Sequence, residues 1–175
     1  MNKKILLPVL TLLICALVLV GLNVGLSGLA EKKAEAELTA TMQTILPGST
    51  TFTEETYTGE DTNIRRVFAA ENGYVIEVAT NGYAGEITML VGVDSDGKVT
   101  GLQVRDMEET FGLGGEALTD HKFLRQYLQT SGEAEVGVNV DAITGATVTS
   151  KAITRCVNSA VAYVTGADAS SGATS

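Results

Sequence analysis

The segment Gly85-Glu-Ile-Thr-Met-Leu-Val-Gly-Val-Asp-Ser-Asp-Gly-Lys-Val-Thr-Gly-Leu-Gln-Val104 decides the fold. It holds two strand-like runs, at residues 85–93 and 98–104, on either side of Asp94-Ser-Asp-Gly97. A turn of this composition between two such runs predicts a β-hairpin, and therefore an antiparallel sheet. Asp94, Asp96 and Gly97 also resemble the start of a calcium loop. The hairpin is the better interpretation, because the required downstream Glu and intervening oxygen ligands are missing.

Further strand-like runs and two helical patterns surround this hairpin. Three strand-like runs precede it, at residues 50–57, 64–69 and 74–79. Two segments repeat apolar residues at helical spacing, over residues 120–128 and 150–164. Strands in succession, with helices before, between and after them, predict an α+β domain with a mostly antiparallel sheet and flanking helices.

The helical patterns also predict which side chains enter the core. Cys156 belongs to the apolar stripe of the later helix, so we expect a small core residue without reactivity. His121 lies at the start of the earlier helix and is expected to be solvated. The two stripes consist of Phe123, Leu124, Tyr127 and Leu128, and of Ile153, Cys156, Val157, Ala160, Val161 and Val164.

The first thirty residues differ in kind from the rest. Residues 5–30 contain no charged side chain, and about 20 apolar residues suffice for a helix to cross a bilayer core. We therefore expect residues 1–30 to be an uncleaved, single-pass transmembrane anchor in the cell membrane. A cleaved signal peptide is the alternative, although its apolar region is typically only about 7–15 residues. Lys3 and Lys4 favour an extracytoplasmic domain, whereas Lys32 and Lys33 weaken that orientation.

The rest of the chain is expected to form one domain. Residues 31–48 are predicted to continue the anchor as a juxtamembrane helix and linker, residues 49–164 to form the compact domain, and residues 165–175 a flexible tail. The 12 basic and 21 acidic residues give a net charge of −9, which excludes binding to nucleic acid. The chain has one histidine and two cysteines, Cys15 in the apolar N-terminal segment and Cys156 in the domain, which excludes a zinc or iron–sulfur site.

The turn Asp141-Ala-Ile-Thr-Gly-Ala-Thr-Val-Thr-Ser150 directly precedes the last helical pattern. The start of a helix offers free N–H groups and a favourable dipole to a phosphate. The same residues also suit a plain helix start, with Thr149 or Ser150 as the N-cap and Gly145 easing the bend into the helix. The residues alone leave both interpretations open, and the Thr hydroxyls could carry an ester.

A second segment that could contact a ligand is the glycine-rich loop Glu109-Thr-Phe-Gly-Leu-Gly-Gly115. Its glycines, with Ala117, can be aligned to a dinucleotide-binding pattern. That pattern requires a βαβ unit, whereas here the loop follows antiparallel hairpin signals. A loop whose glycines let a flat ligand approach the backbone is the remaining interpretation.

Three segments together resemble one known family. Asp141-Ala-Ile-Thr-Gly-Ala-Thr147 resembles the flavinylation motif D-x-x-[ST]-G-A-T of the FMN-binding domain family. Tyr83–Asp94 followed by Gly97–Gly101 resembles the central hairpin of that family. Glu109-Thr-Phe-Gly-Leu-Gly114 resembles its E-T-P-G-L-G loop, with Phe111 in place of the proline. The family includes the G subunit of Rnf-type ion-translocating complexes and the C subunit of the sodium-translocating NADH:quinone reductase.

The resemblance implies a covalent cofactor. In the family the last Thr of the motif carries FMN through a phosphoester bond, here Thr147, and a flavin transferase installs it from FAD. Asp141, Thr144, Gly145, Ala146 and Thr149 would then belong to the phosphate site. Glu109, Thr110, Leu113 and Gly114 would line the isoalloxazine, with Phe111 or Tyr83 as further apolar contacts.

The resemblance also implies a place in a larger assembly. The chain would be an electron-carrying subunit rather than an enzyme by itself. It would exchange electrons with other membrane subunits of a complex that couples ferredoxin and NAD to sodium or proton export. Two alternatives are a stand-alone extracytoplasmic FMN protein of an extracellular electron-transfer or reductase chain, and a non-redox anchored interaction domain.

The tail repeats the motif pattern. Asp168-Ala-Ser-Ser-Gly-Ala-Thr174 also satisfies D-x-x-[ST]-G-A-T. A tail made of Ala, Ser, Gly and Thr produces such a match by composition, and no helical pattern follows to hold a phosphate. We therefore expect the flavin on Thr147 and not on Thr174.

Overall fold

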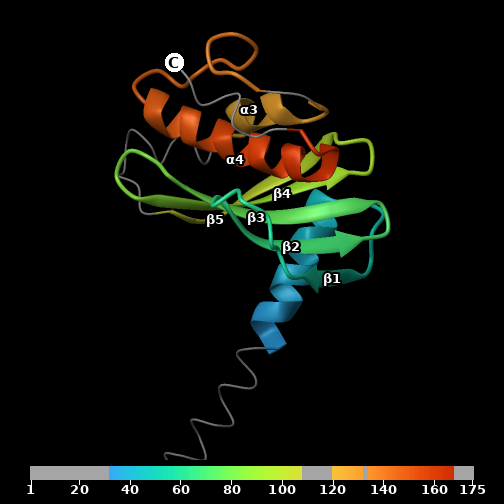
Figure 1. Ribbon diagram of the computed structural model, residues 1–175. Helices are drawn as coiled ribbons and strands as arrows, with labels where there is room; N and C mark the ends of the chain where they lie inside the picture. The colour runs from blue at the N-terminus through green and yellow to red at the C-terminus, as the bar shows by residue number, and fades with distance from the viewer. Residues whose placement is uncertain (1–31, 108–119, 132–133, 168–175) are drawn as a thin grey trace, which may run out of the picture. The chain divides into compact units, whose positions relative to one another are not determined.

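A computed structural model of the chain describes residues 32–107, 120–131 and 134–167 (Figure 1). The predicted anchor at residues 1–30, the loop of residues 109–115 and the motif copy at residues 168–174 lie outside the described residues. Within the described ranges, no helix combines the length and hydropathy needed to cross a membrane. The chain divides into two units, Met1–Ala40 and Thr41–Ser175. The described part of the first unit is helical and carries an exposed ion pair between Lys33 and Glu37.

The second unit contains a five-stranded antiparallel sheet whose spatial order follows the chain. Its strands are β1 (Phe52–Glu55), β2 (Ile64–Ala70), β3 (Gly73–Asn81), β4 (Glu86–Asp94) and β5 (Val99–Met107). The hairpin predicted around Asp94 joins β4 to β5. Asp94 Oδ1 accepts from the N–H groups of Asp96 and Lys98, at 3.0 and 2.8 Å, and Gly97 has a φ of +81°. The antiparallel α+β prediction is therefore confirmed.

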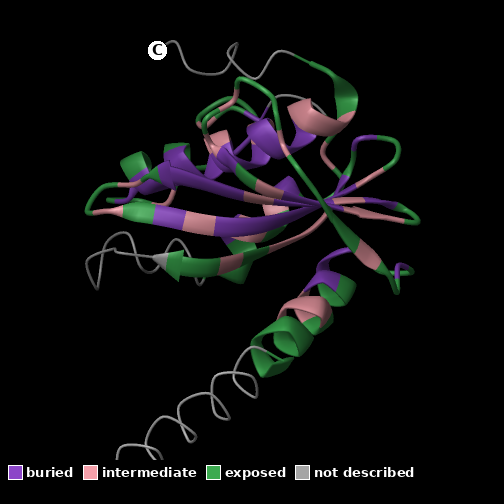
Figure 2. Ribbon diagram, turned by 60° about the horizontal axis from the view of Figure 1, so that its bottom comes forward, coloured by how far each residue is buried: buried purple, intermediate pink, exposed green. Residues whose placement is uncertain are grey.

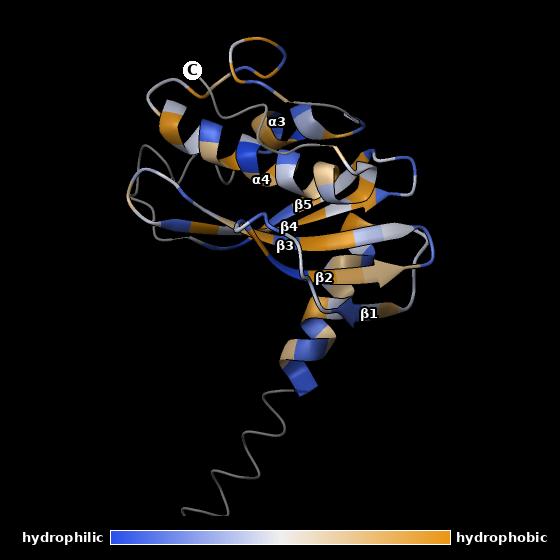
Figure 3. Ribbon diagram, in the orientation of Figure 1, coloured by the Kyte–Doolittle hydropathy of each residue, from blue (hydrophilic) through white to orange (hydrophobic). Residues whose placement is uncertain are grey.

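One face of the sheet is covered by α4 (Thr147–Thr165) together with α3 (His121–Leu124) and the 3₁₀ turn η1 (Arg125–Tyr127) (Figures 1 and 2). Side chains that alternate along β3 and β4 meet the apolar stripe of α4 there. Cys156 is fully buried in this core and His121 is exposed, as predicted. Figure 3 shows the hydrophobic character of the central strands. The core includes Ile76, Val78, Ile87, Met89, Val91, Val93, Phe123, Tyr127, Ile153, Cys156 and Val157.

The other face receives the helical turn that ends at Ile45. A Cβ atom on Gly92 would lie 2.5 Å from the carbonyl oxygen of Ile45, and one on Gly101 would lie 2.6 Å from its Cα. These two glycines therefore let the backbone of Ile45 approach β4 and β5 directly. Thr100 Oγ1 donates to the Ile45 carbonyl at 2.6 Å, and Leu46 is buried beside it.

The helix predicted over residues 120–128 is shorter and tighter than expected. Asp120 accepts from the N–H groups of Lys122 and Phe123 and is its N-cap. After Leu124 the chain continues as η1 and then leaves the helical path, because residues 129 and 130 pair with Val99. Gln129 N–H donates to the Val99 carbonyl at 2.8 Å, and Val99 N–H donates to the Thr130 carbonyl at 2.9 Å. Leu128, the C-cap residue, is already extended with a ψ of 134°, and Gln129 follows with a φ of +65°.

Candidate functional site

The last helix begins three residues earlier than the sequence predicts. Thr149 and Ser150, the expected N-cap residues, lie inside the first turn of α4 and are fully buried. The N-cap residue is Ala146, whose side chain accepts no hydrogen bond from the first turn. The N-cap prediction was therefore wrong. The prediction failed because the chain already bends at Gly145, which has a φ of +82°, so that the helix starts at Thr147.

Ser150 holds the segment 141–146 in place from inside the helix. Its Oγ accepts from Ile143 N–H at 3.2 Å and donates to the Ala146 carbonyl at 2.9 Å. Ala146 N–H in turn donates to the Ile143 carbonyl at 2.9 Å. The hydroxyl that was expected to cap the helix thus closes the turn before it. This segment, residues 141–146, is called the motif loop below.

Burial divides the motif loop and the first helical turn into two sides. Ala146 and Thr149 point inward and are buried. The exposed residues include Asp141, Thr144, Gly145 and Thr147. Most polar side chains of the motif therefore remain accessible to solvent, and to another protein, while buried small side chains anchor the backbone. Val148, next to Thr147, keeps 49% of its surface exposed.

Gln126 of η1 contacts the motif loop at its first residue. Its Nε2 donates to the Asp141 carbonyl at 3.2 Å, and its Oε1 accepts from Asp141 N–H at 2.9 Å. The sequence analysis missed this residue. A glutamine that binds main-chain atoms fifteen positions away leaves no motif and no periodicity, so no signal in the single sequence could have found it.

The neighbouring residue Tyr127 fixes η1 against α4. Its ring is fully buried and its hydroxyl lies 2.8 Å from Thr154 Oγ1, which itself donates to the Ser150 carbonyl. Burial raises the pKa of Tyr127 to about 12, although the Thr154 hydrogen bond lowers it in part. The phenol therefore stays neutral and serves a structural role.

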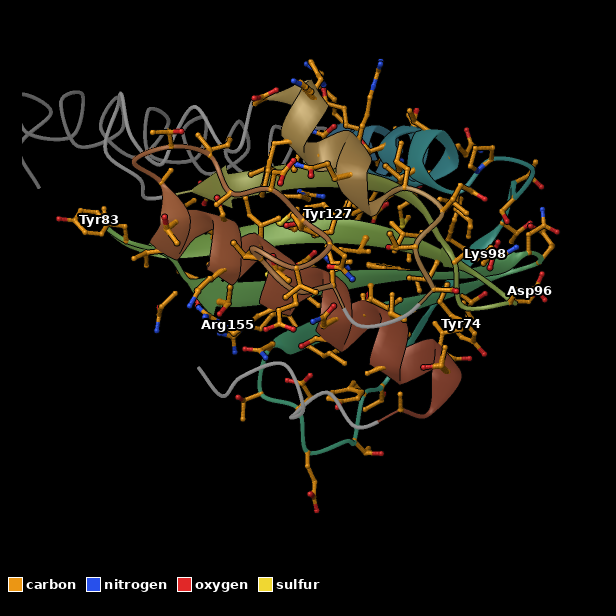
Figure 4. All side chains as sticks on the ribbon, turned by 90° about the horizontal axis from the view of Figure 1, so that it is seen from above. Tyr74, Tyr83, Asp96, Lys98, Tyr127 and Arg155 are labelled. Atoms are coloured by element: carbon orange, nitrogen blue, oxygen red, sulfur yellow. The ribbon has the colours of Figure 1, made fainter. Side chains whose placement is uncertain are left out.

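The β3–β4 turn lies at the same end of the sheet as the start of α4. Arg155 Nη2 donates to the Asn81 carbonyl at 3.1 Å and so connects α4 to the last residue of β3. Figure 4 shows Tyr83 projecting beyond this end of the sheet, while Tyr74 lies at the opposite end. Tyr83 keeps 69% of its surface exposed. The other predicted contacts of a flat ligand, Glu109, Thr110, Phe111, Leu113 and Gly114, lie outside the described residues.

The geometry at Thr147 suits an esterified phosphate. An exposed hydroxyl stands at the first residue of a nineteen-residue helix, and Ala146 offers no acceptor to the first-turn N–H groups. Such groups, with the positive end of the helix dipole, favour an anion. Over the described residues, no group of His, Cys, Asp and Glu side chains could hold a metal ion. The start of α4 is therefore a position at which an anionic group would be stabilised.

Two kinds of comparison with known proteins match parts of the chain. Residues 82–162 match the FMN-binding domain family. This range runs from the β3–β4 turn to α4 and contains the motif loop, Gln126 and Thr147.

Several curated proteins are similar to about half of the chain. The G subunit of the proton-translocating ferredoxin:NAD(+) oxidoreductase complex of Clostridium ljungdahlii is 39% identical over 110 residues, 56% of this chain and 59% of that protein. The G subunit of the Na(+)-translocating complex of Acetobacterium woodii is 37% identical over 98 residues, 51% of this chain and 47% of that protein. The G subunit of an ion-translocating oxidoreductase complex of Methanosarcina acetivorans is 39% identical over 97 residues, 53% and 51% of the two chains. The chain spans about half the length of these relatives.

Proposed function

Because residues 82–162 match the FMN-binding domain family, we propose that this chain is an electron-transfer flavoprotein subunit that carries FMN covalently on Thr147. The observation that carries the proposal is the position of Thr147. It is the last residue of the motif, it is exposed, and it is the first residue of α4. The motif resemblance and the exposed position at the start of the helix both support Thr147 as the attachment point.

The attachment reaction uses FAD and a flavin transferase. The Thr147 hydroxyl oxygen forms a new bond to the FMN phosphorus, the pyrophosphate bond of FAD breaks, and AMP leaves while the hydroxyl proton is lost to a base. The product is a phosphodiester with one negative charge. The first-turn N–H groups of α4 and the helix dipole would stabilise that charge.

The chain itself positions the FMN and contributes no catalytic group. FMN supplies one- and two-electron transfer when it is bound. The motif loop holds the attachment point, and α4 connects it to the sheet through the buried core. Asp141 and Thr144 stay exposed beside Thr147, where a flavin transferase can reach them. Residues 109–114 would complete the flavin site.

The similar proteins support membership of an Rnf-type complex. The named relatives are G subunits of ion-translocating ferredoxin:NAD(+) oxidoreductases. By that similarity the chain passes electrons between neighbouring membrane subunits, with residues 1–30 as its anchor and the flavin domain on the extracytoplasmic side. Covalent attachment is useful there, because a cofactor outside the cytoplasm is not replenished once it dissociates.

The first experiment tests the covalent site. The full chain is produced with a flavin transferase, separated on a denaturing gel and scanned for flavin fluorescence, and its intact mass is measured. We expect one FMN per chain in the wild type and in Thr174→Val, and none in Thr147→Val, which keeps the shape of Thr but lacks the hydroxyl. Thr147→Ser restores a hydroxyl and is expected to restore labelling. Fluorescence that persists in Thr147→Val would refute the assignment.

The second experiment tests the complex. The tagged full chain is purified from membranes of its own cells in a mild detergent, and the co-purifying proteins are identified by mass spectrometry. We expect stoichiometric recovery of the other membrane subunits, in both the wild type and Thr147→Val. A chain that purifies alone while carrying its flavin would favour the stand-alone flavoprotein, and a chain with no flavin would favour the interaction domain.

A further inference from the structure

We propose that Gln126 is the positioning residue of the motif loop, and that it acts by holding the main chain of Asp141 in the conformation in which Thr147 accepts FMN. This inference rests on the proposed function. It adds a residue that lies outside the motif and whose hydrogen bonds are made to the main chain of the loop rather than to the acceptor hydroxyl.

The contact is complementary in both directions. A side-chain amide has one donor group and one acceptor oxygen, and Gln126 uses both on the same residue: Nε2 to the Asp141 carbonyl at 3.2 Å and Oε1 from Asp141 N–H at 2.9 Å. The pair imitates one rung of a β-ladder. It therefore fixes the direction of the backbone at Asp141, a residue that is itself exposed.

The two ends of the motif loop are held by different residues. Ser150 fixes Ile143 and Ala146 from α4, and Gln126 fixes Asp141 from η1. Between them stands Gly145, whose φ of +82° marks the sharp bend into the helix. Without Gln126 the first residue of the motif would lose both of these main-chain hydrogen bonds, while the Ser150 contacts would persist.

Gln126 itself stands on a rigid support. The next residue, Tyr127, is fully buried and its hydroxyl bonds Thr154 of α4. Residues 129 and 130, just beyond η1, pair with Val99 of β5. The 3₁₀ turn is thus fixed to both α4 and the sheet, so the Gln126 amide is presented in a defined place. Because Gln126 is only partly buried, its removal should loosen the loop with little effect on the fold.

The test compares Gln126→Ala and Gln126→Glu with Arg125→Ala, a matched control on the adjacent exposed residue. Purified chains are incubated with FAD and a flavin transferase, and kcat/KM for FMN incorporation is measured. We expect about a tenfold loss in both Gln126 variants, because a misplaced acceptor reacts slowly, and wild-type rates in Arg125→Ala. Gln126→Glu keeps the size of the side chain but loses the donor, so an equal loss there assigns the effect to the amide.

Hydrogen exchange gives the readout that a general loss of stability would not produce. We expect faster exchange confined to residues 141–146 in both Gln126 variants, with an unchanged urea midpoint. Equal incorporation rates in wild type and Gln126→Glu would overturn the inference alone. Slow incorporation with unchanged exchange would also overturn it, since Gln126 would then contact the transferase directly. A wild-type chain that takes up no flavin would overturn the proposed function as well.

Discussion

The two ends of α4 are built in different ways. The first turn is held by directional hydrogen bonds from Ser150 and leaves Thr147 exposed. The last turns are held by aromatic packing. The centroid of the Tyr163 ring lies 5.9 Å from that of Tyr57 and 5.5 Å from that of Tyr74, and both pairs meet edge to face. Gly166 closes this end in the left-handed conformation, with a φ of +69°.

The proposed attachment point and the aromatic contacts that stabilise the fold thus lie at opposite ends of one helix. Packing of aromatic rings excludes water and contributes to the free energy of unfolding. Hydrogen bonds in an exposed loop fix geometry but contribute little net stability. Thr147 is exposed, while the buried Ser150 holds the loop before it through two hydrogen bonds. Substitutions along α4 should therefore fall into two classes.

The largest effect is expected in the middle of the helix. Ile153 is fully buried in the core, and Ile153→Ala should lower the free energy of unfolding by about 3 kcal/mol. Thr147→Ala removes an exposed side chain and should change it by less than about 0.5 kcal/mol. Urea denaturation of the two variants measures both. A cost at Thr147 close to that at Ile153 would mean that the two classes do not exist.

The aromatic end should respond next. Tyr163→Ala removes both edge-to-face contacts and part of the buried ring, and should cost about 2 kcal/mol, whereas Tyr163→Phe keeps the ring and should cost well under about 1 kcal/mol. Folded Tyr163→Ala should still take up FMN at the wild-type rate, measured by fluorescence on a denaturing gel. Loss of labelling in the folded variant would show that the two ends are coupled.

A pair of glycines tests the attachment end. Gly145 and Gly137 both have positive φ values, +82° and +88°, so Ala at either should cost about 1–2 kcal/mol by backbone strain. Gly145 lies in the motif loop, so Gly145→Ala should also slow FMN incorporation. Gly137 lies outside the loop, and a Cβ added there would meet nothing within 4 Å. Gly137→Ala should therefore leave the incorporation rate unchanged. Stability and labelling rate are measured on the same samples. Equal labelling rates would contradict a specific role for the Gly145 bend.

The smallest effect is a pH dependence. Burial raises the pKa of the Cys156 thiol from 9.0 to about 12. The unfolded chain therefore loses this proton at a lower pH than the folded chain. The contribution of the protonated Cys156 thiol to the free energy of unfolding is thus complete below about pH 9 and declines above it. Between about pH 9 and pH 10 the loss should be about 1 kcal/mol. Cys156→Ala should remove that loss in urea titrations; an unchanged pH slope would contradict it.

Local patterns predicted much of the fold. The Asp94–Gly97 turn and the alternating runs around it are readable because a hairpin depends on neighbouring residues. The stripe containing Ile153, Cys156 and Val157 is readable because a helix repeats every 3.6 residues. The helix over residues 120–128 was only partly predicted, since its end is set by pairing of residues 129 and 130 with Val99, a contact between distant segments.

The sequence pointed to Thr147 but not to the residues that hold the loop before it. Thr147 follows from the motif resemblance. The capping role given to Thr149 or Ser150 was wrong, because the direction of a hydroxyl depends on where the preceding loop passes. Gln126 recognises backbone atoms, which are the same in every residue, and therefore leaves no pattern in a sequence. Such supporting residues can be identified only from the three-dimensional structure, in which segments distant in sequence lie side by side.

The close contact of the Ile45 backbone with Gly92 and Gly101 has a mechanical consequence. A pull on the chain from its N-terminal side first meets the contacts of Ile45 and Leu46 with the middle of the sheet. The force does not reach β1 first. This short edge strand follows Leu46 in the chain, and pulling on it would break its hydrogen bonds to β2 one at a time. Load applied there is thus directed into β4 and β5, and the edge of the sheet stays closed.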